Sequence, residues 1–332
     1  MRHLVPRVIV AIGVTLALAG TAIASSQHAG RAQAKLKVAL VLPCPTNDGS
    51  WCQQAYIAAK RLQKEGLIDL KFTSNAPQDT PGASQVIQRY AAGGSQLVIA
   101  HSAYQDAAFN AAKRFKKTPI VFAGGGKVGQ NVSTYEEPIY QPAYLAGILA
   151  AGINKTGTIG GLAAFDIPLC HAQMEAFKAG AKTVKKSIKQ VTTYVGDWAD
   201  VAKAKNATLA AADQGADVFV VCGGGPAAGM ISALKERNLS GFGYVGNQNA
   251  LAPKQMVGSL VYNLYPIFKA LVNDVSSGKY KGKVYDLGLT SFQLPLNPRY
   301  SAGKIPPSAM AKMRAAQRAI LAGSLKVPYV AK

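Results

Sequence analysis

Short runs rich in β-branched residues alternate with segments of helical periodicity along most of this sequence, and this alternation restricts the possible folds more than any other feature. At its first occurrence, the apolar run 37–42 ends at Pro43, and apolar residues then recur at helical spacing over 50–65. Strands that alternate with helices build parallel sheets covered by helices on both faces. Because the pattern occurs in two successive series, the sequence predicts an α/β protein with two doubly wound parallel-sheet lobes.

The expected elements divide between these two lobes. Strands are predicted at 37–42, 70–73, 97–100 and 119–122 in the first series, and at 158–163, 189–194, 218–222 and 243–245 in the second. Helices are predicted at 50–65, 83–92, 107–115 and 142–153, then at 171–181, 202–214 and 229–238, with a last amphipathic helix at 306–322. We expect lobe one to comprise 36–145 and 264–285, and lobe two to comprise 146–263 and 286–332.

The first 24 residues have the pattern of a secretory signal peptide. Arg2 and Arg7 form a basic start, the run 8–24 is mostly apolar, and Ala22-Ile23-Ala24 supplies the small residues that a signal peptidase reads. The alternative is an uncleaved N-terminal anchor. We expect 25–35 to be a flexible segment, and the lack of a cysteine near the cleavage site argues against a lipid anchor. The prediction is therefore a soluble protein, periplasmic or secreted after cleavage.

If the chain is exported, its four cysteines are able to form disulfides. Cys44, Cys52, Cys170 and Cys222 would lie in a compartment that permits disulfides, and four cysteines allow three connectivities. We favour Cys44 with Cys52, which flank one short loop, and Cys170 with Cys222. The alternative is four free, partly buried thiols. No pair has the spacing of a zinc or redox site, so we expect no metal and no cofactor.

The charge balance raises the possibility of a nucleic-acid partner, because 37 Lys and Arg face 16 Asp and Glu, a formal net charge of +21. The basic residues are nevertheless spread over several segments, typical of solvated helix faces and loops, and export removes most nucleic-acid targets. We therefore expect no nucleic-acid partner. The charge would instead assist association with an anionic membrane surface or a transporter.

An exported α/β enzyme is a further alternative. Glycine triplets at 124–126 and 223–225 follow predicted strands, but neither has the spacing of a dinucleotide-binding or phosphate-binding loop. Glycines there allow a ligand to approach the backbone closely. The sequence contains no Ser-His-Asp grouping that would indicate catalysis, so we expect no catalytic residues.

Several motifs resemble one known family. The chain reads YLAGILAA at 144–151, KTGTIG at 155–160, FKAGA at 177–181 and QGADV at 214–218, with NDGSW at 47–51 and GDWAD at 196–200. These resemble motifs of the basic membrane protein (BMP) family of substrate-binding proteins, and the similarity runs from about residue 37 to the end. The resemblance implies a type I periplasmic binding fold, a monomer that closes on a purine nucleoside or base, and an ABC importer permease as partner. The first four motifs are expected to be scaffold.

The two tryptophans of the chain follow predicted strands, one in each lobe. Where this sequence has Trp51 and Trp198, the family typically has a phenylalanine that stacks on the purine. Two aromatic rings suit a flat heterocycle because offset π contacts add to the burial of area. The alternatives are two core or rim tryptophans, or a cationic ligand held by cation–π contacts. Tyr104 would add another ring or belong to the packing.

Polar groups in the same loops would orient the ligand. Asn47 and Asp48 are either ligand contacts or a helix N-cap, since Asn and Asp favour both. Asp200 is expected to cap the helix that follows it. The candidate ligand contacts that remain after predicted strands are Ser102, Asp166, Gly223, Gly224, Asn247 and Gln248, whereas His171 is more consistent with a structural role. Asn263 is a further candidate, in the segment 261–263 where the resemblance implies a crossover strand.

One departure from the family affects the expected ligand. Nucleoside-binding members have an acidic residue that grips the ribose hydroxyls, whereas this chain reads GNQN at 246–249, and the family's lysine has no clear match at 261–263. An amide forms hydrogen bonds but does not act as a charged bidentate acceptor. A free base or another planar aromatic solute is therefore as consistent with this sequence as a nucleoside. A ligand-sensing partner of a membrane receptor would share the same fold and pocket.

Overall fold

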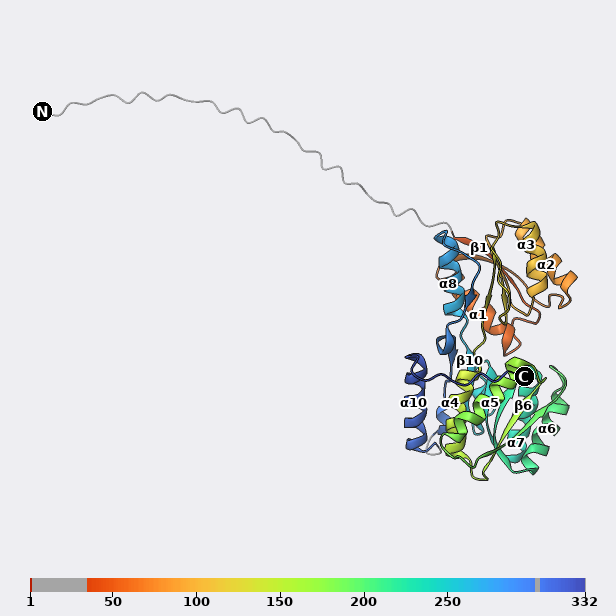
Figure 1. Ribbon diagram of the computed structural model, residues 1–332, viewed down its shortest axis with the longest axis vertical. Coiled ribbons are helices and arrows are strands. Elements are labelled where there is room, and N and C mark those ends of the chain that lie inside the picture. The colour runs from red at the N-terminus through yellow and green to blue at the C-terminus, as the bar shows by residue number, and fades with distance from the viewer. Residues whose placement is uncertain (2–34, 302–304, 332) are drawn as a thin grey trace. The chain divides into compact units, whose positions relative to one another are not determined.

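The computed structural model describes Met1, residues 35–301 and residues 305–331. The predicted signal peptide at 1–24, and all but the last residue of the expected flexible segment at 25–35, lie outside this part of the chain, apart from Met1. Residues 35–331 contain two six-stranded sheets, each surrounded by helices (Figure 1). None of the described helices is long and apolar enough to cross a membrane.

The first sheet is parallel throughout and follows the order β11-β5-β4-β3-β1-β2. Its strands are β1 (Leu36–Val41), β2 (Ile68–Thr73), β3 (Leu97–Ala100), β4 (Ile120–Ala123), β5 (Val132–Tyr135) and β11 (Val284–Tyr285). Its helices are α1 (Trp51–Lys64), α2 (Thr80–Ala92), α3 (Gln105–Arg114) and α8 (Tyr265–Ser276). We call this sheet with its helices the first lobe. The order of its strands reverses between β1 and β3, which is where ligands bind in doubly wound folds.

The second sheet follows the order β12-β10-β9-β8-β6-β7, and only β12 is antiparallel to its neighbour. Its strands are β6 (Thr158–Ala163), β7 (Lys189–Tyr194), β8 (Ala216–Cys222), β9 (Ser240–Val245), β10 (Met256–Tyr262) and β12 (Phe292–Gln293). Its helices are α4 (Tyr140–Ile153), α5 (Pro168–Lys182), α6 (Val201–Asp213), α7 (Gly224–Arg237), α9 (Pro298–Ser301) and α10 (Pro307–Leu321), with 3-10 turns η1 (Asn249–Leu251) and η2 (Gly288–Ser291). These elements form the second lobe, whose strand order reverses between β6 and β8.

The side chains of β1 show why helices cover both faces of the first sheet. Val38 and Leu40 point to the face packed against α1 and α8, whereas Ala39 and Val41 point to the face packed against α2 and α3. Successive side chains of a strand alternate between the two faces. Because all four are buried, the strand reads as a continuous apolar run.

Two glycines fix the packing of α4 against α5 in the second lobe. A Cβ atom on Gly147 would lie 1.9 Å from the carbonyl oxygen of Phe177, and one on Gly180 would lie 1.9 Å from that of Tyr144. Only glycine permits helix backbones to approach this closely. The YLAG and FKAGA motifs thus have a structural explanation in the crossing of two helices.

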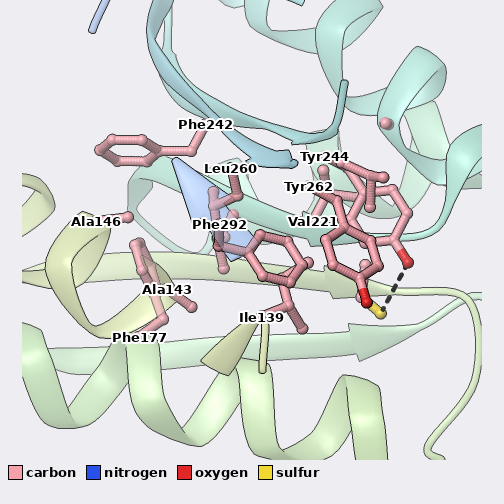
Figure 2. Packing of buried hydrophobic residues seen from close by; sticks show 14 of the residues in the cluster. Ile139, Ala143, Ala146, Phe177, Val221, Phe242, Tyr244, Leu260, Tyr262 and Phe292 are labelled. Atoms are coloured by element: carbon pink, nitrogen blue, oxygen red, sulfur yellow. Dashed lines mark hydrogen bonds between the residues drawn. The ribbon is translucent and has the colours of Figure 1, made fainter. Parts of the chain in front are cut away.

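The chain passes between the lobes after β5, after β10 and after β11. Tyr262, the last residue of β10, donates a hydrogen bond from its hydroxyl to the carbonyl oxygen of Glu136, at 2.8 Å. Its ring stacks on Phe292 with centroids 4.4 Å apart, above Ile139 at the start of α4 (Figure 2). The crossing segments are therefore held to one another by a buried aromatic pair and a hydrogen bond.

Several elements differ from the sequence prediction. No regular structure was expected for β5, whose VSTY sequence lacks an apolar pattern although all four residues are buried. None was expected for α8, β11, β12 or α9, and of β10 only the end at 261–263 was expected, as a crossover strand. Helix α7 begins at Gly224, five residues before the expected start, because Pro226 is compatible with a first helical turn although it suggested a loop.

Candidate functional site

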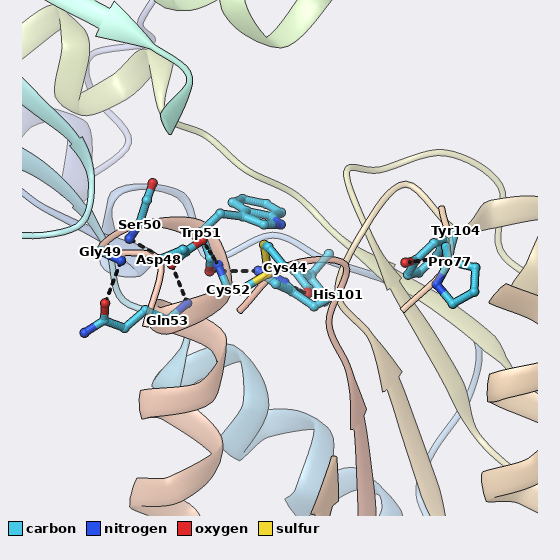
Figure 3. The surroundings of a disulfide bond; sticks show 11 residues. Cys44, Asp48, Gly49, Ser50, Trp51, Cys52, Gln53, Pro77, His101 and Tyr104 are labelled. Atoms are coloured by element: carbon cyan, nitrogen blue, oxygen red, sulfur yellow. Dashed lines mark hydrogen bonds between the residues drawn. A yellow bond between two sulfur atoms is a disulfide. The ribbon is translucent and has the colours of Figure 1, made fainter. Parts of the chain in front are cut away.

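The loop between β1 and α1 is held by one carboxylate and one disulfide. Asp48 accepts hydrogen bonds from the backbone N–H groups of Ser50 (2.9 Å), Cys52 (3.0 Å) and Gln53 (3.0 Å) (Figure 3). It thereby satisfies donors that the first turn of α1 leaves unpaired. Asp48 thus performs the capping alternative in this structure, whereas the side chain of Asn47 is exposed.

Both disulfides match the pairing favoured from the sequence. Cys44 is bonded to Cys52 within the β1–α1 loop, and Cys170 at the start of α5 is bonded to Cys222 at the end of β8. Each bond therefore fixes a segment that follows the carboxyl end of a central strand.

Trp51, the first residue of α1, lies on a buried histidine. Its indole stacks on the imidazole of His101 with centroids 4.2 Å apart and planes 18° apart. Its backbone carbonyl accepts a hydrogen bond from the same ring, at 3.1 Å from Nε2. Trp51 is partly buried, and the ring of Tyr262 is tilted by 35° relative to the indole, with the two centroids 5.9 Å apart. One face of the indole is therefore supported by the protein before any ligand arrives.

His101 is neutral in this position. It is fully buried directly after β3, and burial lowers its pKa to about 3, although the bond to Trp51 opposes this shift. A neutral imidazole has one donor, so Nε2–H donates to Trp51, and Nδ1 accepts from the hydroxyl of Tyr135 at 2.5 Å. This arrangement fixes the ring that supports the indole.

Trp198 is placed differently, in the segment between β7 and α6. Its ring is 45% exposed and packs obliquely on Phe165, which follows β6, with centroids 5.5 Å apart. Its carbonyl accepts a hydrogen bond from the N–H of Gly225 at 3.0 Å, and a Cβ atom on Gly225 would lie 2.6 Å from the same oxygen. The start of α7 therefore holds the backbone of Trp198 while leaving its ring accessible.

The loops of the two lobes touch beside these tryptophans. A Cβ atom on Gly246 of the second lobe would lie 2.2 Å from the carbonyl oxygen of Gly49 in the first. A Cβ atom on Gly224 would lie 4.0 Å from the hydroxyl of Ser50, which is buried and has no hydrogen-bond partner among the described residues. Gly49 and Ser50, which precede Trp51, therefore lie close to Gly246 and Gly224 of the second lobe.

One strained backbone position lies at the same boundary. Val245, the last residue of β9, has a φ of +60°, a left-handed conformation that β-branched residues rarely adopt. The N–H of Gly246 bonds to the carbonyl of Tyr244 at 2.6 Å, which closes a three-residue turn around Val245. Such strain persists only where the surrounding structure enforces it, and it is common at ligand-binding segments.

Glu137 is a carboxyl group without an ion pair or hydrogen bond to the described residues. It follows β5, and an added Cβ on Gly124 would lie 3.7 Å from its Oε1. Burial first, and the charge of Glu136 second, raise its pKa to about 8. The residue nevertheless retains partial contact with solvent. A carboxyl crowded by protein atoms yet reached by solvent is suited to accept hydrogen bonds from a ligand.

The other predicted contacts are mostly engaged within their own lobe. Tyr104 is 4% exposed, and its hydroxyl donates to the carbonyl of Pro77 at 2.9 Å, so it belongs to the packing here (Figure 3). Gln248 is buried and accepts from the N–H of Tyr244, Asn263 accepts from the N–H of Tyr265, and Asn247 is exposed. Asp200 caps α6 as expected, through a bond from the N–H of Lys203 at 2.8 Å.

Three predicted contacts remain: Asp166 in the β6–α5 loop, Gly223 before α7 and Ser102 after β3. Asp166 accepts a hydrogen bond from His171 Nδ1 at 2.8 Å, and the hydroxyl of Tyr194 lies 3.3 Å from the same nitrogen. Gly223 has a φ of +127° directly before α7, a conformation that needs glycine. Ser102 is partly exposed in the turn after β3.

The fold brings to this boundary several residues to which the sequence assigned no individual role. Ser50, His101 and Phe165 lie in strand-end loops that the sequence indicates, whereas Glu137, Val245 and Tyr262 were not considered as site residues. His101 and Phe165 had a usable signal, because each directly follows a predicted strand. Glu137 follows β5, which had no recognisable pattern, so its position at a strand end was hidden.

Two hollows border these segments. One, of about 460 Å³, lies beside the end of β9 and the segment after β12, and the other, of about 70 Å³, lies between α1 and the β10–α8 crossing. The larger is lined in part by Asn247 within the second lobe, whereas the smaller includes Tyr262 and adjoins the crossing after β10.

Two doubly wound lobes joined by three crossing segments, with aromatic and polar residues where their strand ends meet, define the type I periplasmic binding fold. Residues 35–297 match the family of PnrA-like ABC transporter substrate-binding proteins, abbreviated Bmp. The chain belongs to this family, which consists of binding proteins and not of catalysts. Family membership implies a small-molecule ligand and association with an ABC transporter.

Individual relatives are distant in sequence. A purine-binding protein of Brucella abortus is 27% identical over 258 residues, which cover 77% of this chain and 73% of that protein. The nucleoside-binding protein BmpA of Lactococcus lactis is 31% identical over 225 residues, or 65% and 63% of the two chains. The fold is similar to that of an ABC transporter solute-binding protein from Conexibacter woesei, with a TM-score of 0.76, 22% identity, and coverage of 90% and 100%.

Proposed function

We propose that this protein binds a planar heteroaromatic solute, a purine base or nucleoside, between its lobes and delivers it to an ABC importer. The observation that carries the proposal is the support of Trp51 by His101, because a stacking surface that is fixed in advance lowers the entropy cost of binding a flat ring. The purine- and nucleoside-binding relatives support the same ligand class.

Trp198 and Glu137 would complete this site from other segments. The exposed indole of Trp198 would cover the ligand from the second lobe, and Phe165 limits its movement. The carboxyl of Glu137 would accept hydrogen bonds from a ring N–H, an exocyclic amine or ribose hydroxyls. This side chain would supply, from a different segment, a carboxyl that the sequence lacks at 246–249. With a pKa of about 8 it is mostly protonated at neutral pH, so it would act as a neutral acceptor and donor and not as a charged bidentate acceptor.

The cellular setting follows from the same proposal. Cleavage after residue 24 would release a monomer into an extracytoplasmic compartment, where both disulfides form readily. The permease would recognise the form in which both lobes contact the ligand. Capture would proceed by hinge closure about the crossing segments.

Intrinsic fluorescence and calorimetry of the refolded, ligand-free protein test this proposal. Adenine, guanine, hypoxanthine, their nucleosides and simple aromatic acids are titrated into wild type, Trp51→Phe and Trp51→Leu. We expect saturable binding of a purine that Trp51→Phe retains, and that Trp51→Leu weakens about 2- to 10-fold, the contribution of one aromatic contact. Trp198→Leu should weaken binding in the same direction.

Phe72→Ala is the control. Phe72 is 42% exposed, close to the 45% of Trp198, but it lies on the edge strand β2. Equal affinities of Trp51→Leu, Trp198→Leu and wild type would contradict the aromatic site. If no purine binds to the folded protein, the ligand assignment fails. Saturable binding of a non-aromatic solute would place the protein with a different ligand class.

A further inference from the structure

Six lysines gather at one edge of the second lobe, away from the ligand-binding segments. Lys155 precedes β6, Lys182 ends α5, Lys185 and Lys186 lie in the following turn, Lys189 begins β7, and Lys312 lies in α10. We call them the lysine cluster. Except for Lys185, which is partly buried, all of them are exposed.

Contacts tie these segments together. The N–H of Lys189 donates to the carbonyl of Gly157 at 2.9 Å, and a Cβ atom on Gly157 would lie 3.6 Å from Nζ of Lys185. Nζ of Lys312 donates to the carbonyl of Thr183. Positions up to 157 residues apart in the sequence therefore form one surface patch, since β6 and β7 are parallel and begin at the same edge of the sheet.

The patch has little compensating negative charge. None of the six lysines forms an ion pair with a residue in the described part of the chain. The neighbouring carboxylate of Asp217 accepts hydrogen bonds from the Asn154 side chain and the N–H of Lys155. The partial negative charge at the C-terminal end of α5 attracts cations, which explains why Lys182 and Lys185 lie there. It does not account for lysines from three other segments.

We propose that the lysine cluster docks the protein on the anionic lipid headgroups of a membrane. Lysine acts as a hydrated point charge without the planar fork that arginine uses for bidentate recognition, so a patch of lysines alone suits a diffuse anionic surface. Val184, 39% exposed among them, offers one apolar contact. The family's association with a membrane transporter brings the protein close to a bilayer.

Vesicle sedimentation of the full mature chain tests this docking. Vesicles that contain phosphatidylglycerol are compared with pure phosphatidylcholine for wild type and for the triple variant Lys182→Gln, Lys186→Gln, Lys189→Gln. Each lysine near an anionic surface strengthens partitioning about fivefold, so the triple variant should bind on the order of 100-fold more weakly. Raising the ionic strength should weaken wild-type binding.

The matched control is Lys113→Gln, Lys116→Gln, Lys117→Gln, which removes the same charge from an exposed basic segment of the first lobe. A similar loss in both triple variants would show that net charge alone drives binding and would overturn the proposal. Failure of the wild type to bind anionic vesicles, or binding only when the transporter is present in them, would also overturn it. Ligand titration of the same variants should be unchanged, which separates this result from any failure of the proposed function.

Discussion

At the scale of single residues, Glu137 couples the site to pH. Burial first, and the charge of Glu136 second, raise its pKa from 4.5 to about 8. Between these two values the folded protein retains a proton that the unfolded chain releases. The favourable contribution of this group is therefore complete below about pH 4.5 and is lost as the pH rises through 8.

Glu137→Gln should remove the loss of folding stability that wild type undergoes as the pH rises towards 8. The full shift would correspond to about 5 kcal/mol at about 1.4 kcal/mol per unit, and because the side chain keeps partial contact with solvent we expect about 1–3 kcal/mol. Urea unfolding should show the variant more stable than wild type at pH 8, with the difference shrinking towards pH 5. A difference that grows on acidification would contradict the assignment. The variant should also bind the ligand more weakly.

At the scale of elements, the two disulfides have separable effects. Cys44–Cys52 closes a loop with a sequence separation of 8, and Cys170–Cys222 one of 52. On loop entropy alone, removing the first should cost about 2–3 kcal/mol of stability and removing the second about 4 kcal/mol. Because the short loop carries Asp48 and leads into Trp51, its removal should reduce ligand affinity more.

Paired Cys→Ala variants measure both quantities, through urea unfolding and ligand calorimetry. The order of the two variants in stability should be the reverse of their order in affinity. If Cys44→Ala, Cys52→Ala retained wild-type affinity, the disulfide would not help to position Trp51.

At the scale of the whole molecule, contact between the lobes decides binding. Gly246→Ala would place a Cβ atom 2.2 Å from the carbonyl of Gly49 and so oppose the close approach of the two loops. We expect ligand affinity to fall at least about tenfold, because the binding-competent state becomes less populated. The melting temperature without ligand should change little.

Gly152→Ala provides the contrasting control for that prediction. Its Cβ would lie 2.4 Å from the Cβ of Ala309, where α10 packs on α4 within the second lobe. This change should lower the melting temperature and leave affinity nearly unaltered. The prediction fails if Gly246→Ala lowers the melting temperature as Gly152→Ala does and leaves affinity unchanged.

Much of the architecture could be read from local patterns. The strands at Thr158–Ala163 and Lys189–Tyr194 have the bounds that the sequence predicts, because each begins after a turn and ends at a polar or small residue. Helices began earlier than predicted where the first turn contains proline or polar residues, as in α2, α5 and α7. β5 escaped notice because its burial comes from neighbouring elements and not from an apolar sequence.

Local periodicity and spacing were enough to predict the two α/β lobes and the strand-end positions of Trp51 and Trp198. They favoured one disulfide pairing without deciding it, because Cys170 and Cys222 are 52 residues apart in the sequence. Tertiary packing was needed to show that His101 supports Trp51, that the Glu137 carboxyl is crowded and has no ion pair or hydrogen bond to the described residues, and that six separate lysines share one surface. These properties depend on which distant segments pack together, and a residue's own neighbours along the chain carry little information about that packing.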